Sequence, residues 1–249
     1  MREKLIALSM AKKGDWNQIY HFLSQDRDLS GIDEKAAIVM VNRLTCDTIT
    51  IFDENYPKVL KDMSRPPFVL YYQGDLSLLY VPSVAVVGGK KPSTYTIDGI
   101  QRYFLDSKNI FSIVTGTEMG VEDAVFDVTS KRIVILGSGV EHAPKVFQKD
   151  DLILTEYPPA VKWTSKGHFR SYHLICELAD AVTIFELPTS DIRLKYLGYL
   201  AEIGKPVFVY PDRDTTATKG GLQLVNRGAR LLINRQEMLD LFLSVTAIY

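Results

Sequence analysis

From residue 83 onward, short apolar runs alternate with segments whose apolar residues recur at helical spacing. The runs are SVAVVG (83–88), FSIVTG (111–116), RIVILGSG (132–139), LILTEYP (152–158), AVTIFEL (181–187), PVFVYP (206–211) and ARLLI (229–233). They are apolar on both faces, which is typical of strands in a parallel sheet covered by helices on both sides. Helices are predicted over Ile97–Leu105, Val121–Val128 and Ile192–Ile203. The alternation predicts an α/β fold with a Rossmann-like, doubly wound, mostly parallel sheet.

The first 48 residues carry a purely helical pattern. Apolar residues recur at helical spacing at Leu5, Ile6 and Met10, at Trp16, Ile19, Tyr20 and Leu23, and at Ala36, Ala37, Met40 and Leu44. Asp15 and Asp33 are predicted helix N-caps. Residues 49–82 contain Pro66-Pro67, so turns and extended pieces are expected there. We therefore predict a small helical module over 1–48 and a Rossmann-like domain over 49–249.

Composition narrows the class of protein. Its 249 residues suit one large domain, or one domain with a small appendage. Cys46 and Cys176 are too few and too far apart for a disulfide framework or a zinc knuckle, which favours a reducing, cytoplasmic location. The N-terminal apolar run is too short for a signal peptide or a membrane span, so no membrane partner is expected. The net charge of −1 means that any DNA site would have to be a local patch.

Three predicted strands end in glycine and small polar residues, at the sheet edge where ligands bind in open α/β folds. These strand ends are Gly88, Gly89, Lys90, Lys91, Ser93 and Thr94; Thr115 and Gly116; and Gly137, Ser138 and Gly139. Close backbone approach, free helix N-terminal amides and the two lysines together predict a phosphate site. The competing interpretation is structural, because turns from strand to helix often demand glycine. No GxGxxG follows the first strand and no Walker-type GxxxxGKS/T occurs, which disfavours ordinary dinucleotide and nucleoside triphosphate binding.

The segment KWTSKGHFRSYH (162–173) interleaves cations with aromatic rings, as in sites that neutralise phosphates and stack bases. We predict that Lys166 and Arg170 neutralise phosphates there. Phe169, Tyr172 or Trp163 is expected to stack on bases. A solvated surface loop with scattered aromatic residues is the competing interpretation.

No catalytic constellation stands out. His168 and His173 lie five residues apart, which is not a helical spacing for metal ligands. Glu118, Glu122 and Asp123 follow the second strand. They are interpreted as charges favoured at a helix start, and the alternative is that they bind a sugar hydroxyl or act as an acid. We therefore predict no catalytic residue, no metal and no cofactor.

Several motifs together resemble the DNA-processing protein DprA (Smf) family. They are YPKVLKDMSRPPFVLYYQGD (56–75), VAVVGGKKPSTY (84–95), IVTGTEMGVEDAVF (113–126), IVILGSG (133–139), LTEYPP (154–159) and GKPVFVYP (204–211). No single motif is decisive, but their number, order and spacing over 51–243 make the resemblance specific.

The resemblance implies a Rossmann-like core that binds single-stranded DNA, loads a RecA-type recombinase and commonly forms a homodimer. It also implies a small helical, SAM-like N-terminal module, which matches residues 1–48. Many family members carry a C-terminal winged-helix domain, and the chain is expected to lack one. The implied function is that of a recombination mediator that protects single-stranded DNA during DNA uptake and natural transformation.

The chain departs from the family pattern in the DNA groove. The family's Gly-Ser-Arg is Gly88-Gly89-Lys90 here, and lysine keeps the charge but loses the bidentate fork. The family's Arg-Asn-Arg aligns with Ser171-Tyr172-His173, so His173 falls in the expected groove and Arg170 is the nearest remaining cation. These changes predict weaker, differently placed DNA binding, or a shift toward contact with a protein partner.

Two alternatives from other classes remain open. One is a nucleotide-cleaving enzyme similar in fold to the LOG-type phosphoribohydrolases, whose PGGxGTxxE pattern shares only a fragment with Thr115-Gly116-Thr117-Glu118. The other is a protein-interaction remnant with weak DNA binding, which the altered groove and the near-zero net charge favour.

Overall fold

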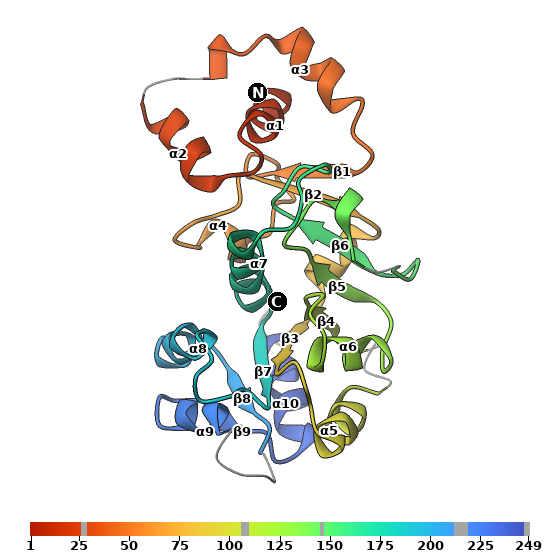
Figure 1. Cartoon of the computed structure of the whole chain (residues 1–249), viewed down its shortest axis with the longest axis vertical. Coiled ribbons are helices and arrows are strands. Elements are labelled where there is room, and N and C mark those ends of the chain that lie inside the picture. The colour runs from red at the N-terminus through yellow and green to blue at the C-terminus, as the bar shows by residue number, and fades with distance from the viewer. Residues whose placement is uncertain (26–28, 106–109, 145–146, 212–218, 247–249) are drawn as a thin grey trace. The chain divides into compact units, whose positions relative to one another are not determined.

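A computed structural model of the chain describes residues 1–25, 29–105, 110–144, 147–211 and 219–246, with side chains described up to residue 240 (Figure 1). Two compact units make up the chain. The first combines Met1–Tyr80 with Ile133–Leu178, and the second combines Val81–Arg132 with Ala179–Tyr249. The predicted division into a module of residues 1–48 and a domain of residues 49–249 stays a prediction.

The N-terminal segment of the first unit is helical, as the periodicity predicts. Its helices are α1 (Arg2–Ala11), α2 (Trp16–Ser24), the 3-10 turn η1 (Leu29–Gly31) and α3 (Glu34–Val41). Both predicted N-caps are confirmed, because the Asp15 carboxylate accepts from the amide of Gln18 and the Asp33 carboxylate accepts from those of Lys35 and Ala36. Leu5 and Ile6 of α1 are fully buried in a cluster that includes Tyr71, so the helices share a core with the neighbouring sheet.

The strands of the first unit run in the order β1-β2-β6-β5. They are β1 (Asp47–Thr50), β2 (Val69–Gln73), β5 (Arg132–Ile135) and β6 (Leu152–Thr155). The β1/β2 and β2/β6 pairs are antiparallel, and the β5/β6 pair is parallel. The remaining elements are α4 (Lys58–Lys61), η2 (Leu76–Tyr80), η4 (Val140–His142) and α7 (Ser165–Leu178).

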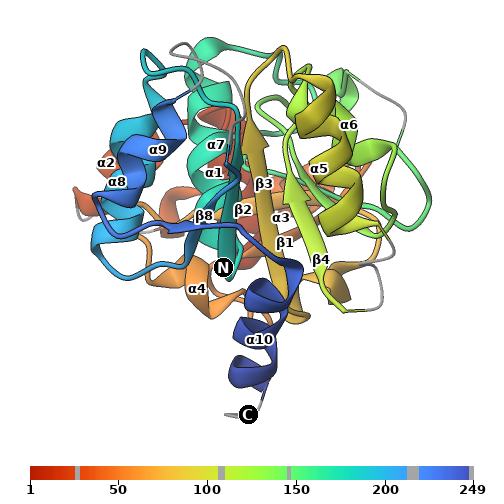
Figure 2. The same cartoon turned by 90° about the horizontal axis from the view of Figure 1, so that it is seen from below.

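The second unit is a parallel sheet covered on both faces. Its strands run β4 (Ser112–Thr115), β3 (Ser83–Gly88), β7 (Ala181–Phe185), β8 (Val207–Val209) and β9 (Arg230–Leu231). Its helices are α5 (Thr94–Phe104), α6 (Val121–Phe126), α8 (Arg193–Glu202), α9 (Gly220–Val225) and α10 (Arg235–Thr246). Figure 2 shows α5 and α6 on one side of these strands and α8 and α9 on the other. Every residue of β3, β4 and β7 is buried, which explains why these runs are apolar throughout.

The predicted fold class is confirmed. Each predicted strand is present, although several are shorter than the apolar run that predicts them; the run over 132–139, for example, is a strand only as far as Ile135. The predicted helix over 192–203 begins at Arg193 and ends at Glu202. Within the described residues, no helix has both the length and the apolar character that crossing a bilayer requires.

Candidate nucleic-acid interface

The loop after β3 is tightly packed against its own unit. A Cβ atom at Gly88 would lie 2.3 Å from the carbonyl oxygen of Phe185, and one at Gly89 would lie 2.4 Å from that of Glu186. The Gly89 amide donates to the carbonyl of Phe185 at 3.1 Å. Glycine is therefore required here by packing, as the structural interpretation of these residues expects. The Gly89 amide, predicted to receive a phosphate, already has an acceptor.

An internal carboxylate occupies the start of α5. Glu186 accepts from the backbone amide of Ser93 at 2.6 Å and from its hydroxyl at 2.5 Å. Ser93 in turn caps α5 through a bond from the amide of Thr96 to its side chain. Helix N-termini favour negative charge, so Glu186 lies where a phosphate was predicted to bind. A phosphate at Ser93 and Thr94 would have to displace it.

The two lysines of this loop differ in their surroundings. Lys90 is 68 % exposed, and its ammonium group lies 3.0 Å from a carboxylate oxygen of Glu118. Lys91 is exposed, and the ion pairs between described residues do not include it. Glu118 is also 3.6 Å from the guanidinium of Arg193. Lys91 is therefore the cation of this loop that is best placed to meet a phosphate.

Sequence reasoning missed Arg193, which organises the loop from the start of α8. Its guanidinium donates to the carbonyl of Gly88 at 2.9 Å and pairs with Asp191 at 2.8 Å, and its side chain is 8 % exposed. Burial raises the pKa of Asp191, but the hydrogen bonds from Arg193 outweigh it and hold the pKa below its usual value. Arg193 thus holds the loop in place, and no local motif marks this role because the carbonyl of Gly88 lies 105 residues away in the sequence.

The residues of the loop after β4 make their contacts within their own unit. Thr115 and Gly116 are buried, and the Thr115 hydroxyl lies 3.5 Å from the carbonyl of Val86 in β3. Glu122 accepts from the amide of Glu118 at 2.8 Å, and Asp123 accepts from that of Gly120 at 3.2 Å. The interpretation as helix-start charges is therefore confirmed for Glu122 and Asp123, which lie in the first turn of α6, but not for Glu118, which precedes the helix. In the fragment shared with nucleotide-cleaving enzymes, Thr115 faces the sheet and Glu118 is held in ion pairs.

In the first unit, the loop after β5 and the start of α7 lie together. A Cβ atom at Gly137 would lie 2.9 Å from the backbone of His168, and one at Gly139 would lie 2.1 Å from the carbonyl oxygen of Pro158. Ser138 is buried, with its hydroxyl 3.3 Å from the carbonyl of His142. The structure thus brings two predicted features together, the third strand end and the cation-rich segment.

The cation-rich segment is helical over most of its length. Residues 165–178 form α7, so the competing interpretation of a surface loop is wrong. Two of the predicted base-stacking residues lie on different faces of α7. Phe169 is 41 % exposed, whereas Tyr172 is 2 % exposed and packs in the core. The prediction that Tyr172 stacks on a base needs correction. Trp163, which precedes the helix, is 60 % exposed.

Both predicted cations of α7 are paired with carboxylates of their own unit. The guanidinium of Arg170 forms a two-pronged pair with Glu156 at 2.7 and 2.8 Å, and it also donates to the carbonyl of Arg65. Lys166 lies 2.7 Å from Asp15, but its side chain is 67 % exposed. Arg170 is mainly a partner for the buried Glu156, whereas Lys166 can turn toward a ligand.

Two ionisable groups on this face have shifted pKa values. Burial raises the pKa of Glu156, and the charge and hydrogen bonds of Arg170 offset part of that rise. Burial and the positive charge of Arg170 lower the pKa of His173 to about 4. His173 is therefore neutral at physiological pH and does not neutralise a phosphate there. Its ring lies 4.9 Å from that of Phe169, four residues earlier on α7.

In the first unit, an exposed group of cations and rings at the start of α7 is open to a ligand. Lys162, Trp163, Lys166 and Phe169 are all exposed, and we name this set the α7 surface. It offers ammonium groups and aromatic faces together, which is the chemistry of single-strand binding. The described residues contain no group of three or more His, Cys, Asp or Glu side chains that could hold a metal ion.

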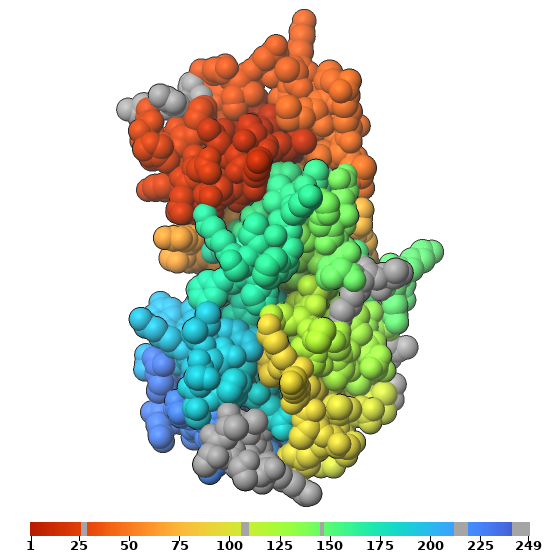
Figure 3. Space-filling view, in the orientation of Figure 1, coloured from red at the N-terminus to blue at the C-terminus, as the bar shows by residue number. Residues whose placement is uncertain are grey.

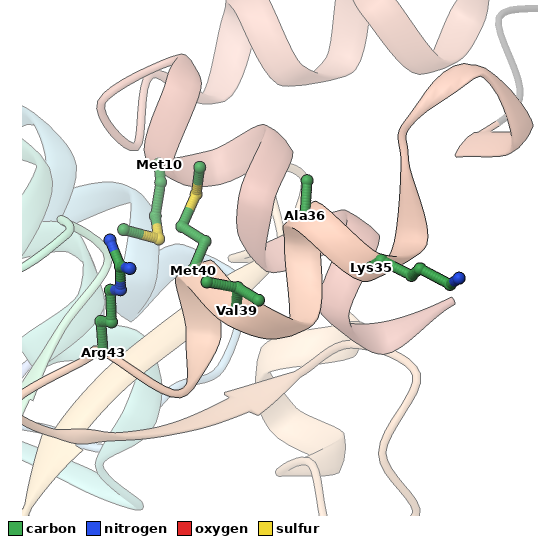
Figure 4. A pocket seen from close by; sticks show the side chains of 6 residues that line it. All are labelled: Met10, Lys35, Ala36, Val39, Met40 and Arg43. Carbon is green, nitrogen blue, oxygen red and sulfur yellow. The ribbon is translucent and has the colours of Figure 1, made fainter.

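A separate hollow of about 520 Å³ opens on the N-terminal helices (Figure 4). Its lining residues are Met10, Lys35, Ala36, Val39, Met40 and Arg43, from α1, α3 and the turn after α3. The hollow is mostly apolar and is lined by none of the residues predicted to bind DNA.

The family model for DNA recombination-mediator protein A matches residues 47–243. The chain is 29 % identical over 210 residues to the protein Smf of Synechocystis sp., covering 77 % of this chain and 52 % of that one. It is 28 % identical over 209 residues to the DNA processing protein DprA of Streptococcus pneumoniae, covering 78 % and 74 % of the two chains. This chain therefore spans about half the length of the Synechocystis protein.

Solved structures show the same fold. The DNA processing protein A of Streptococcus pneumoniae superposes with a TM-score of 0.78 at 22 % identity, covering 96 % of this chain and 97 % of that one. The DNA processing protein A of Helicobacter pylori, whose single-stranded DNA binding mode is known, superposes with a TM-score of 0.71 at 24 % identity over 82 % and 99 % of the two chains. At these identities the likeness establishes the architecture alone.

Proposed function

Because the chain belongs to the DNA recombination-mediator protein A family, we propose that it binds single-stranded DNA and acts as a recombination mediator. The observation that carries the proposal is the α7 surface. Lys162 and Lys166 are exposed beside the exposed rings of Trp163 and Phe169. Ammonium groups neutralise a backbone, and rings stack on bases irrespective of sequence.

We extend the proposal to the finer role that the family suggests. In it, the protein coats and protects single-stranded DNA, loads a RecA-type recombinase onto it, and works as a homodimer in the cytoplasm during DNA uptake and natural transformation. Support for the DNA step comes from the Helicobacter pylori relative, which binds single-stranded DNA. The role needs no catalytic group, since binding and hand-over of a strand break no covalent bond.

A second candidate function is protein interaction with weak DNA binding. It is favoured by the carboxylates that pair with predicted DNA-binding cations, namely Glu118 with Lys90, Asp15 with Lys166 and Glu156 with Arg170. Each pair reduces the positive charge available to a phosphate. Salt dependence separates the two candidates, because phosphate contacts release counterions and contacts with apolar protein surfaces do not.

The test is a titration of fluorescein-labelled oligo-dT with the full chain, followed by anisotropy at several salt concentrations. A recombination mediator is expected to bind with an affinity that falls steeply as salt rises. Duplex DNA of the same length serves as the control and should bind more weakly. Absence of a salt-sensitive anisotropy change would overturn the proposed function and favour the interaction candidate.

A further inference from the structure

Three aromatic rings form a continuous stack at the start of α2. The ring of Trp16 lies 4.8 Å from that of Tyr20, with an angle of 9° between their planes. The ring of Trp16 also lies 5.6 Å from that of Phe68, with an angle of 25° between their planes. The indole N–H of Trp16 donates to the carbonyl of Pro66 at 2.8 Å. Trp16 thus stacks with both Tyr20 and Phe68 and is fixed by its indole N–H.

The stack ends on an exposed ring. Tyr20 is 53 % exposed, and Ile19 is the residue of α2 that is buried. Attachment of α2 to the Pro66 turn explains Trp16 and Phe68, but it does not require an aromatic ring at Tyr20. An exposed ring held parallel to a second ring is already oriented for a further flat partner, which would lose little freedom on joining the stack.

Positive charge lies beside the rings. The guanidinium of Arg65 is 5.4 Å from the centre of the Trp16 ring, and Arg65 is exposed. Lys12 and Lys13 occupy the turn that leads into α2. Asp15 is the nearest carboxylate in sequence, and Lys166 pairs with it at 2.7 Å. Cations around a stack of rings suit an unpaired nucleobase with its phosphate, because every base has a face to stack and every phosphate a charge to neutralise.

Two contacts connect residues beside the stack with α7 within the first unit. Asp15, which precedes Trp16, holds the ammonium group of Lys166. The carbonyl of Arg65 accepts from Arg170 of α7. In addition, a Cβ atom at Gly14 would lie 2.6 Å from the carbonyl of Glu156, so the turn before α2 is packed closely against the segment that carries Glu156. Figure 3 shows the N-terminal helices (red) and the segment of α7 (blue-green) on the same face of this unit.

We propose that the Phe68–Trp16–Tyr20 stack is a nucleobase platform that extends the single-strand path from the α7 surface onto the N-terminal helices. One unpaired base stacks on the exposed face of Tyr20, and Arg65 neutralises an adjoining phosphate. The proposal rests on the proposed function, since it adds a subsite to the same ligand. Trp16 and Tyr20 precede residue 47, so these two members of the stack lie outside the range that the family model matches.

The test compares Tyr20→Ala and Tyr20→Phe in the full chain, using fluorescein-labelled oligo-dT and anisotropy. Tyr20→Ala is expected to weaken binding about fivefold or more, the usual effect of losing one stacked base, while Tyr20→Phe keeps wild-type affinity. Tyr199→Ala is a matched control, because Tyr199 is 52 % exposed and lies on α8 of the second unit. Urea denaturation of each variant verifies that it is folded.

A second measurement needs no substitution. Oligo-dT carrying 5-iodouracil is bound to the wild-type chain, cross-linked by light and digested, and the labelled peptide is identified by mass spectrometry. A cross-link at Tyr20 is expected. Equal affinity of Tyr20→Ala and wild type, with cross-links confined to other segments, would overturn the platform alone. Failure of the wild type to bind oligo-dT would overturn the proposed function together with it.

Discussion

The carboxylate of Glu186 and the backbone amide of Ser93 form a hydrogen bond of 2.6 Å at the N-terminus of α5. Glu186 directly follows β7 and adopts a positive φ of 44°, which is uncommon for a residue with a side chain. The strained backbone directs an anion of the chain into the place where α/β proteins of this architecture bind anionic ligands. The amide at the start of α5 is therefore already occupied by a carboxylate of the chain. A ligand can bind this amide only if Glu186 leaves it.

Glu186→Gln is expected to tighten binding of oligo-dT about two- to fivefold, because it removes a negative charge worth about 0.3–1 kcal/mol at a helix terminus. The amide oxygen can still accept from Ser93, so the loop should keep its conformation. Anisotropy titrations at low salt measure the change. Glu202→Gln is the control, since Glu202 is an exposed carboxylate on α8 paired with Arg227. Unchanged affinity of Glu186→Gln would show that DNA does not approach this loop.

Lys91→Ala is expected to weaken binding more than Lys90→Ala, because Lys90 is already paired with Glu118 at 3.0 Å. Loss of one phosphate contact should reduce the slope of log affinity against log salt by about 0.7 for single-stranded DNA. The double change Lys90→Glu with Lys91→Glu should lower both the affinity and the slope further. The measurement is a salt series for each variant, and a slope equal to that of the wild type would remove the first loop from the interface.

Much of the fold follows from local pattern. Strands such as β3 and β7 are buried along their whole length, so their apolar runs predict them without knowledge of the neighbouring strands. The caps Asp15 and Asp33 act within three residues, and the sequence therefore shows them directly. Strand ends were less predictable, because an apolar run continues into a buried loop, as it does after Ile135.

The site was less predictable, for two physical reasons. Within residues 162–173 the alternation of cations and rings hides the helical phase, which only the spacing of Tyr172 with Ile175 and Leu178, the buried face of α7, makes visible. The contacts that occupy the predicted phosphate-binding groups join distant segments: Lys166 lies 151 residues from Asp15, and Ser93 lies 93 residues from Glu186. Long-range pairing of charges leaves no periodic signal in a single sequence.

His173 should make folding sensitive to mild acid. Its pKa is lowered to about 4 in the folded chain, so between pH 6.5 and 4 the unfolded chain binds a proton that the folded chain does not. The stability it contributes is present above pH 6.5 and is lost as pH falls. His173→Phe is expected to reduce the loss of unfolding free energy between pH 7 and pH 5. Urea denaturation at both values measures this, and identical pH dependence in variant and wild type would contradict it.

Arg170→Ala should produce the opposite dependence on pH. Glu156 is 8 % exposed and loses its two-pronged partner, so at pH 7 we expect the free energy of unfolding to fall by about 3–5 kcal/mol. An unpaired buried carboxyl has a pKa above its unfolded value, and the folded variant then binds more protons than the unfolded chain. The deficit should therefore shrink as pH falls toward 5. Lys166→Ala, which breaks an exposed pair, is the control and should cost at most about 1 kcal/mol. Urea denaturation at pH 7 and 5 decides, and a deficit that grows in acid would show that Arg170 does not act through Glu156.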